Sequence, residues 1–349
     1  MKKYDAIVFI GRFQPVHNAH VEILRRAAQL TNNVIVIIGS AHLPRTTKNP
    51  FTALERQDML EKVTKDIRQE EPSCSFNFEF VGNNMYNDQA WVVEVQRIVD
   101  DNIFTDTDTK IGIIGHVKDD SSFYLKMFPQ WEFVEQPLIE PLDATQIREL
   151  YFFNGKPNYN WFAGVLPEST TSFMKVFSHT EEYKQLVREA EFLRNYKKQW
   201  EHSPYPPIFV TVDAVFIHSG HVLMIKRRAE PGKGLWALPG GFVDALHDRS
   251  VEDAMIRELK EETGIKLPEK VIRGSIKDTK VFDAIDRSQR GRTITHAFHI
   301  SSIEGEWALP KVKGSDDAEK AMWVPIGKLN SEEVYEDHLS IIQYFLGNT

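Results

Sequence analysis

The chain has 349 residues, of which 42% are hydrophobic and 26% are charged. This length exceeds what one ordinary core organises and predicts two domains, and the composition excludes a disordered or fibrous chain. The formal net charge of −8 excludes a broad basic surface, so local basic residues are better matched to small phosphates than to DNA or RNA.

No segment approaches the roughly 20 apolar residues that span a bilayer, and the first residues lack the apolar stretch of a secretory signal. We therefore expect a cytoplasmic protein without membrane contact. Cys74 is the only cysteine, which excludes an intrachain disulfide and a cysteine-based zinc cluster. The sequence leaves the oligomeric state open, and a homo-oligomer is compatible with it.

The first third of the chain alternates short β-branched runs with helical patterns. Strands are predicted at residues 6–10, 34–38, 76–81 and 111–114, and helices at residues 20–30 and 89–99. This alternation predicts an α/β domain with a doubly wound, Rossmann-like parallel sheet. Ligands of such sheets bind beyond the carboxyl ends of the strands, where His17, Ser40 and His116 fall.

The segment from Gly11 to His20 joins the first predicted strand to the first predicted helix. A glycine allows close approach of a phosphate, and a helix amino terminus presents free N–H groups to an anion. His17 and His20 are three residues apart, so both side chains can donate to the same phosphate oxygens. A pair of packing or surface histidines, or half of a metal site, would show the same spacing.

Two motifs together resemble the nicotinamide mononucleotide (NMN) adenylyltransferase branch of the nucleotidyltransferase superfamily. The first is Gly11-Arg12-Phe13-Gln14-Pro15-x-His17-x-x-His20, in which Ala19 stands where the family usually has glycine. The second is Asp143-x-Thr145-x-Ile147-Arg148, in which Asp143 replaces the family's serine. The resemblance implies that ATP is a substrate and that its adenylyl group passes to NMN, giving NAD and pyrophosphate.

The resemblance also implies site residues in this domain. His17, His20 and Arg148 would hold the triphosphate together with Mg²⁺. Trp91 would stack on the cationic nicotinamide ring, although packing of Trp91 on the sheet is an open alternative. The remaining expected binding residues are Gly11, Arg12, Phe13, Lys48, Asp143 and Thr145, together with Gly115, Lys118 and Asp119, which are assigned by position only. Lys48 could equally be a solvated loop charge.

A charged helical pattern at residues 181–200 precedes a proline-rich stretch at residues 203–207. We therefore expect an adenylyltransferase-like domain at residues 1–180, a linker at residues 181–206 and a second domain at residues 207–349. In the second domain, apolar runs at residues 209–217 and 222–225 flank His218-Ser219-Gly220-His221, which predicts a β-hairpin.

The run Arg257-Glu258-Leu259-Lys260-Glu261-Glu262-Thr263-Gly264 is the strongest signal in the second domain. On a helix, Glu258 and Glu262 lie on one face with Glu261 beside them, while Gly264 closes the helix. Clustered carboxylates suit Mg²⁺ or Mn²⁺, although a solvated helix face would show the same spacing. The preceding Gly240-Gly241-Phe242-Val243 favours the metal site.

These residues resemble the Nudix box, which implies an α+β Nudix domain, an α/β/α sandwich that hydrolyses diphosphates. The implied metal ligands are the Gly240 carbonyl, Glu258, Glu261 and Glu262. The chain has two more residues than the box between Gly241 and Arg257, and Arg249 stands where the box has its first glutamate. We expect Asp244 or Asp248 to replace that glutamate.

The substrate of the second domain is predicted from the segment around Arg290 and Arg292, which resembles ADP-ribose-type Nudix domains. Either arginine would contact the diphosphate or the terminal ribose, or be an exposed hairpin charge. Asp317 or Glu319 is the expected base, unless this acidic turn is merely solvated. The order of the two domains resembles fused bacterial enzymes of NAD metabolism and implies cleavage of ADP-ribose to AMP and ribose 5-phosphate. A non-catalytic ADP-ribose or NAD sensor that regulates the first domain is the alternative.

Overall fold

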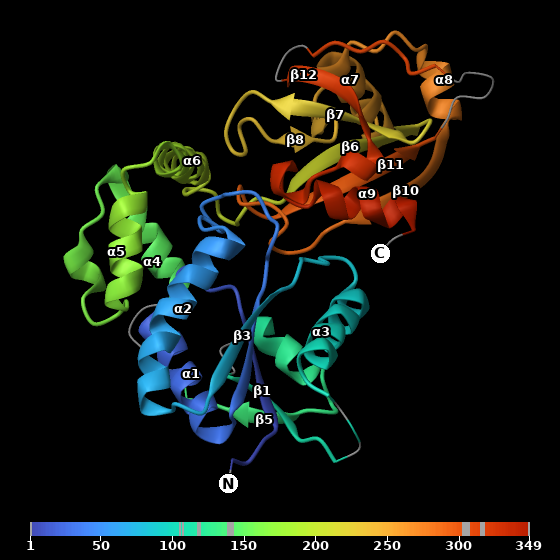
Figure 1. The fold of residues 1–349 in the computed structure, drawn as a ribbon. Helices are drawn as coiled ribbons and strands as arrows, with labels where there is room; N and C mark the ends of the chain where they lie inside the picture. Colours follow the sequence, from blue (N-terminus) through green and yellow to red (C-terminus); the bar gives the residue numbers. More distant parts are fainter. Residues whose placement is uncertain are drawn as a thin grey trace. The chain divides into compact units, whose positions relative to one another are not determined.

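The computed structural model describes residues 2–104, 106, 108–116, 120–137, 143–301, 308–314 and 318–347. The chain forms two compact units, Met1–Val187 and Arg188–Thr349, each with its own sheet (Figure 1). The division falls inside helix α6 (Glu181–Lys198), whereas the sequence placed this helix in a linker. In the part of the chain that is described, no helix is long and apolar enough to cross a membrane.

The first unit is built on a five-stranded parallel sheet with the order β3-β2-β1-β4-β5. Its strands are β1 (Ala6–Gly11), β2 (Asn33–Ile38), β3 (Ser75–Phe80), β4 (Ile111–Gly115) and β5 (Glu132–Glu135). Because β1 pairs with both β2 and β4, the strand order reverses at β1 and opens a crevice at its carboxyl end. The predicted doubly wound sheet is confirmed.

Helices cover both faces of this sheet (Figure 1). They are α1 (Asn18–Leu30), α2 (Ala53–Glu70) and α3 (Asp88–Asn102). Helix α3 buries Val92, Val95 and Val99 against the face of β1 that carries Ala6 and Val8. This i, i+3, i+7 spacing places one apolar stripe on the sheet, so packing rather than intrinsic propensity stabilises the helix.

A helical extension completes the first unit. It comprises α4 (Ala144–Tyr151), η2 (Phe153–Gly155), η3 (Tyr159–Phe162) and α5 (Glu168–Phe177), whereas η1 (Asp120–Lys126), between β4 and β5, packs on the sheet through Leu125. Tyr151 donates from its hydroxyl to the Met174 carbonyl at 2.7 Å, and Tyr183 of α6 donates to the Tyr151 carbonyl at 2.8 Å. Farther along α6, Glu189 accepts from the Gly232 amide at 3.2 Å within the second unit. The helix is therefore part of both packed units.

The second unit contains a mixed sheet with the order β10-β11-β6-β7-β12, to which β8 and β9 add at β7 and β6. Its strands are β6 (Phe209–His218), β7 (His221–Arg227), β8 (Trp236–Ala237), β9 (Gly240–Phe242), β10 (Ile276–Phe282), β11 (Thr293–Ile300) and β12 (Ala318–Pro325). The predicted hairpin is confirmed: β6 and β7 pair antiparallel around Ser219 and Gly220, whose φ angles are 47° and 72°.

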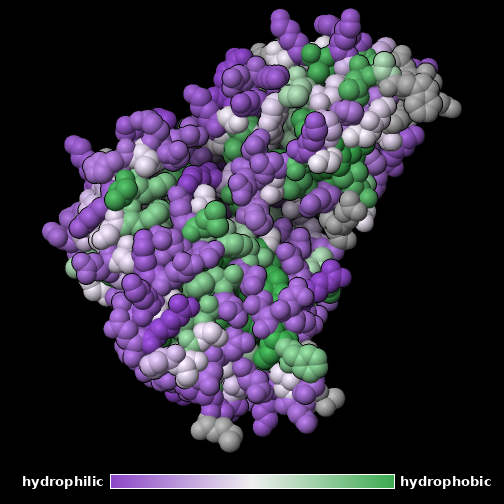
Figure 2. Space-filling model, in the orientation of Figure 1, coloured by the Kyte–Doolittle hydropathy of each residue, from purple (hydrophilic) through white to green (hydrophobic). Residues whose placement is uncertain are grey.

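Helices again pack on both faces of this sheet. They are α7 (Val251–Thr263), α8 (Glu269–Gly274) and α9 (His338–Leu346), with short turns η4 (Ile326–Lys328) and η5 (Ser331–Glu333). Alternate residues of β6 face opposite sides: Val212 and Ala214 pack with α7, while Asp213 approaches His338 of α9. The predicted α/β/α Nudix architecture is confirmed. Hydrophilic side chains cover most of the surface visible in Figure 2.

Candidate functional site

The chain leaves β1 through a glycine at the point where the strand order reverses. A Cβ atom added to Gly11 would lie 2.8 Å from the ring of Phe13, so a larger residue there would displace that ring. The Gly39 amide, directly after β2, donates to the Gly11 carbonyl at 2.8 Å. Phe13 itself has a φ of 52°, a backbone conformation that L residues rarely adopt. The two strand ends are thereby held together beside the start of α1.

The two predicted histidines do meet, at the amino terminus of α1. Their rings stack with centroids 3.7 Å apart, and the His17 amide donates to Nδ1 of His20 at 3.2 Å. Burial, with smaller contributions from His17 and His116, holds the pKa of His20 well below its usual range. His20 is therefore neutral, and because Nδ1 accepts, its proton lies on Nε2. A neutral N–H donor at a helix amino terminus suits a phosphate oxygen.

Helix α4 brings the second motif to the first. Arg148 donates to the Gln14 carbonyl at 2.8 Å and to the Thr145 hydroxyl at 3.1 Å. Burial, and then the charge of Arg12, lowers the pKa of Arg148 to about 10, so the guanidinium stays charged at neutral pH. Asp143 accepts from the Thr145 and Gln146 amides at 2.9 Å and caps α4. Its substitution for serine therefore preserves the helix start that aims Arg148.

A second buried arginine, Arg56 of α2, was not predicted from the sequence. Its guanidinium donates to the Arg12 carbonyl at 2.7 Å and to the Gly39 carbonyl at 2.6 Å. A signal was present, because Arg56 shares the apolar stripe of α2 with Met59, Leu60 and Val63. A charged side chain on such a stripe needs polar partners in the core.

The loop between β2 and α2 is held by an arginine–carboxylate pair. Arg45 makes two bonds to Glu55, at 2.6 and 2.7 Å, and Glu55 also accepts from the Thr52 amide at 2.8 Å. Arg45 thus stabilises the start of α2. Lys48 lies partly buried in the same loop, near the end of β2. Its predicted role at the phosphates stays a prediction.

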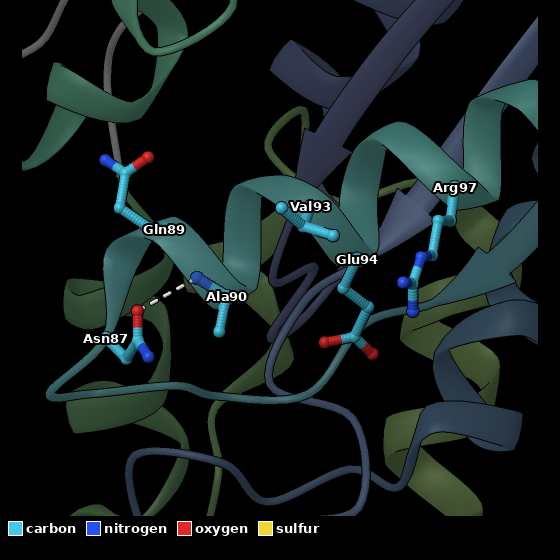
Figure 3. A pocket seen from close by; sticks show the side chains of 6 residues that line it. All are labelled: Asn87, Gln89, Ala90, Val93, Glu94 and Arg97. Atoms are coloured by element: carbon cyan, nitrogen blue, oxygen red, sulfur yellow. Dashed lines mark hydrogen bonds between the residues drawn. The ribbon is translucent and has the colours of Figure 1, made fainter. Parts of the chain in front are cut away.

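Trp91 is partly buried in the first turn of α3 and packs against the core. Its ring centroid lies 6.1 Å from that of Tyr124 and 5.9 Å from that of Phe128. The packing alternative is thus realised, and the predicted stacking on nicotinamide stays a prediction. A separate hollow of about 490 Å³ runs along another face of α3, which does not include Trp91 (Figure 3). Its lining residues are Asn87, Gln89, Ala90, Val93, Glu94 and Arg97.

The end of β4 completes the crevice. The Gly115 carbonyl accepts from the Gln136 amide at 2.7 Å, which fixes the strand end. His116 follows directly and is close enough to lower the pKa of His20. Lys118 and Asp119, which the sequence placed near the adenosine, lie outside the described residues.

In the second unit, the two glycines of β9 lie directly against helix α7. The Gly240 amide donates to a Glu262 carboxylate oxygen at 2.8 Å. A Cβ atom added to Gly241 would lie 2.5 Å from an oxygen of Glu258. Burial is the main cause that raises the pKa of Glu262 to about 8; the Gly240 bond opposes it and Glu258 adds to it. The strand backbone and two of the three predicted carboxylates therefore meet.

Asp248 is the carboxylate that contacts Arg257 in the irregular part of the box, where Arg249 stands at the position of the first glutamate. Its two oxygens accept from Nε and Nη2 of Arg257 at 2.9 and 2.8 Å. Asp244 instead pairs with His247, at 2.7 Å. Asp248 therefore replaces the missing glutamate, and Arg249 is not needed for this contact. Gly264 ends α7 with a φ of 57°, as predicted.

The carboxylates of α7 are chemically suited to a divalent cation. Arg257 contacts Glu258 at 2.8 Å and Glu261 at 3.0 Å, so these two carboxylates already share a cation. Within the described residues, no three His, Cys, Asp or Glu side chains are grouped closely enough to hold a metal ion. Glu258, Glu261, Glu262 and the Gly240 carbonyl are nevertheless oxygen donors of the kind that Mg²⁺ and Mn²⁺ prefer. Their chemistry fits such an ion, although this structure does not bring the three carboxylates together.

A buried polar network supports the strand that carries Gly240 from the other face of the sheet. His338 of α9 accepts at Nδ1 from the Leu238 amide, at 2.8 Å. Arg287 is bonded to both oxygens of Asp337, at 2.9 and 3.0 Å. Thr295 donates to Asp213 at 2.6 Å. These contacts were not predicted; the only sequence signal was an aspartate inside the apolar run of β6.

The structure describes three of the four other residues predicted for the second unit. The Arg290 guanidinium lies 4.8 Å from the centroid of the Phe242 ring, beside β9. Arg292 is partly buried, and its carbonyl accepts from the Phe209 amide at 2.9 Å. Glu319 is exposed on β12, and Asp317 lies outside the described residues. The roles of all four stay predictions.

Fold and site together define a nucleotide-binding enzyme of two classes: an α/β nucleotidyltransferase unit and a Nudix unit. Residues 8–150 match the cytidylyltransferase-like family, and residues 207–345 match the NUDIX domain family. The chain is 43% identical over 190 residues to the nicotinamide/nicotinic acid mononucleotide adenylyltransferase of Acinetobacter baylyi, covering 54% of this chain and 95% of that protein. It is 36% identical to the ADP-ribose pyrophosphatase of Methanocaldococcus jannaschii, covering 39% of this chain and 72% of that protein.

A solved structure matches both units at once. The bifunctional NMN adenylyltransferase/ADP-ribose pyrophosphatase of Francisella tularensis has a TM-score of 0.87 and 35% identity, with 99% of each chain covered. A second crystal structure from Francisella tularensis contains AMP and a manganese ion, with a TM-score of 0.86, 34% identity and 99% of each chain covered. The chain belongs to this family of adenylyltransferase–Nudix proteins.

Proposed function

We propose that the first unit transfers the adenylyl group of ATP to NMN, giving NAD and pyrophosphate. The second unit would cleave ADP-ribose to AMP and ribose 5-phosphate. The observation that carries the first activity is the meeting of His17, His20 and Arg148 at the crevice beside β1. The second activity is carried by the contact of Gly240 and Gly241 with Glu262 and Glu258 of α7. Both agree with the printed activities of the relatives from Acinetobacter baylyi, Methanocaldococcus jannaschii and Francisella tularensis.

In the first reaction, a phosphate oxygen of NMN attacks the α-phosphorus of ATP. The bond between this phosphorus and the bridging oxygen to the β-phosphate breaks, and pyrophosphate leaves. No protein nucleophile is needed, so the residues position the reactants and stabilise developing charge. Nε2–H of His20 donates to a phosphate oxygen, while Arg148 and Arg12 supply positive charge. Bound Mg²⁺ would add charge neutralisation on the phosphates.

In the second reaction, water attacks one phosphorus of ADP-ribose, and the bond from that phosphorus to the bridging oxygen breaks. Glu258, Glu261, Glu262 and the Gly240 carbonyl would hold Mg²⁺ or Mn²⁺, which supplies Lewis acidity for this step. Asp317 or Glu319 would take the proton of the attacking water. Arg290 and Arg292 would bind the diphosphate or the terminal ribose.

The alternative role of the Nudix unit as a sensor rested on the irregular box. Asp248 accepts two hydrogen bonds from Arg257, so the arginine of the box has a carboxylate partner although Arg249 stands in place of the glutamate, and this supports hydrolysis. We therefore retain hydrolysis as the function of this unit.

Product analysis of the full chain tests both activities. Incubation with ATP, Mg²⁺ and either NMN or nicotinic acid mononucleotide is expected to give the corresponding dinucleotide and pyrophosphate in equal amounts. Incubation with ADP-ribose and Mg²⁺ is expected to give equal amounts of AMP and ribose 5-phosphate. Absence of a dinucleotide with both acceptors would refute the first activity, and binding of ADP-ribose without turnover would refute the second.

A further inference from the structure

Arg56 of α2 is a fully buried cation beside the adenylyl-transfer site. Only 1% of its surface is exposed. It lies in the first turn of α2, after the N-cap residue Thr52, and points toward the carboxyl ends of β1 and β2. A buried charge is costly unless it is bonded, so such a residue needs a specific reason to be present.

Four hydrogen bonds from its guanidinium end on backbone carbonyls. Nε donates to Thr52 at 3.1 Å, and Nη1 donates to Arg12 at 2.7 Å and to Gly39 at 2.6 Å. Nη2 donates to Ser40 at 3.2 Å. Three of these carbonyls belong to the segments that leave β1 and β2, on either side of the crevice. The planar guanidinium of arginine spreads its N–H donors widely enough to reach all of these carbonyls, whereas the ammonium of lysine carries its donors on one nitrogen atom.

Two residues next to these carbonyls have unusual backbone conformations. Phe13, whose peptide bond contains the Arg12 carbonyl, has a φ of 52°, and Ser40 has a φ of 49°. Non-glycine residues keep such conformations only where their surroundings fix them. The ring of Phe13 packs edge-on against His20, with centroids 4.9 Å apart. Arg56 is thus linked through the Arg12 peptide and Phe13 to the histidine that donates to the phosphates.

The positive charge of Arg56 is not neutralised by an ion pair among the described residues. The neighbouring Glu55 carboxylate is bonded to Arg45 and to the Thr52 amide instead. Burial lowers the pKa of Arg56 to about 10, a value at which the side chain is still charged at neutral pH. Arg56 therefore adds to the positive potential of Arg12 and Arg148 where a triphosphate would lie.

We propose that Arg56 is a positioning residue for adenylyl transfer. Its guanidinium hydrogen bonds fix the segments that follow β1 and β2, so that His20 and Arg12 are held facing the triphosphate of ATP. Its positive charge also favours binding of this anion. This inference rests on the proposed adenylyl-transfer function. Because the four bonds described end on protein carbonyls, Arg56 acts through other groups and is not assigned a contact with the reacting atoms.

The experiment compares Arg56→Lys and Arg56→Met with Arg68→Lys in the full chain. Arg68 lies on the same helix but is exposed, and it contacts the carbonyl and the ring of Phe76, at the start of β3. NAD formation is measured with ATP and NMN varied separately, and ADP-ribose hydrolysis by the same preparation serves as the internal control. Thermal unfolding shows whether each variant is folded at the assay temperature.

Arg56→Lys keeps the charge but loses the fork, so kcat for NAD formation is expected to fall about 10- to 100-fold, as for a misplacement of about 1 Å. Arg56→Met also loses the charge. In this variant the KM for ATP should therefore be higher than in Arg56→Lys, and it should depend less on ionic strength. The KM for NMN and the hydrolysis of ADP-ribose should change little in both variants, and Arg68→Lys should match the wild type.

The inference would be overturned if the Arg56 variants were folded and had the same kcat and the same KM for ATP as Arg68→Lys. So would unfolding of the first unit in both variants, because Arg56 would then be a purely structural residue. Failure of the wild-type protein itself to form NAD would instead refute the proposed function, and the two failures are therefore distinguishable.

Discussion

Asp248→Asn is expected to impair the Nudix unit although Asp248 lies outside the metal-binding carboxylates. Asp248 accepts three hydrogen bonds, two from Arg257 and one from the Asp244 amide at 2.7 Å. Arg257 also contacts Glu258 and Glu261. Without Asp248, the Arg257 guanidinium is shared only by Glu258, Glu261 and the Phe242 carbonyl, so it competes more strongly with Mg²⁺ for the two carboxylates. Asp248 thus keeps the arginine in a fixed place beside the metal ligands.

The burial of the Asp248–Arg257 pair sets the expected loss in the free energy of unfolding. The Asp248 side chain is 4% exposed, whereas the Arg257 side chain is 29% exposed, so the pair lies between a surface and a buried ion pair. Hydrogen bonds to charged groups contribute about 1.5–3 kcal/mol each, and asparagine keeps one acceptor. We therefore expect a loss of about 2 kcal/mol in the free energy of unfolding of this unit. For a unit of this size the loss corresponds to roughly 4–8 °C in Tm.

The assay measures thermal unfolding and the Mg²⁺ dependence of ADP-ribose hydrolysis for Asp248→Asn and for the control Asp244→Asn. Asp244 is partly exposed and pairs with His247 rather than with Arg257, so its variant should keep its Mg²⁺ requirement. Asp248→Asn should need more Mg²⁺ for half-maximal rate and have a lower kcat. Equal Mg²⁺ requirements and equal unfolding temperatures for the two variants would refute this reasoning.

Three further predictions concern separate residues. Trp91→Ala should raise the KM for NMN far more than the KM for ATP if its ring stacks on nicotinamide, and equal changes would leave only the packing role. Glu262→Gln should abolish ADP-ribose hydrolysis and the stabilisation of the second unit by Mg²⁺ while NAD formation persists; retained hydrolysis would contradict its assignment. Burial lowers the pKa of His338 to about 3, below the 6.5 of an unperturbed histidine. The unfolded chain therefore binds a proton that the folded unit excludes, and stability should fall by about 1.4 kcal/mol per pH unit as the pH drops below 6.5. His338→Asn keeps an acceptor for the Leu238 amide and should flatten this fall in urea unfolding; an unchanged slope would contradict the account.

Much of the fold follows from local sequence patterns. The β-branched runs of β1 and β2 and the two-residue hairpin turn at Ser219-Gly220 have periods and turn residues that are visible within ten positions. The pairing of His17 with His20 follows from their spacing at a helix start. The meeting of these residues with Arg148 was predicted from a family motif, because nothing in the local sequence reports a contact between distant segments.

The interactions that were missed join residues that are far apart in the chain. Arg56 bonds to a carbonyl 44 residues away, and Arg287 bonds to Asp337 across 50 residues. The apolar stripe of α2 marks Arg56 as a buried charge, but the sequence pattern does not show which groups Arg56 or Arg287 contacts. The choice between Asp244 and Asp248 also required the structure, because both lie in one loop and only its folded path decides which reaches Arg257.

We expect the two active sites of this chain to work independently. Product chromatography tests this after the full chain is incubated with ATP, NMN, ADP-ribose and Mg²⁺, alongside the His20→Ala and Glu262→Gln variants. His20→Ala should stop NAD formation but still release ribose 5-phosphate from ADP-ribose, and Glu262→Gln should do the reverse. Loss of both activities in either folded variant, or of neither in both, would contradict it.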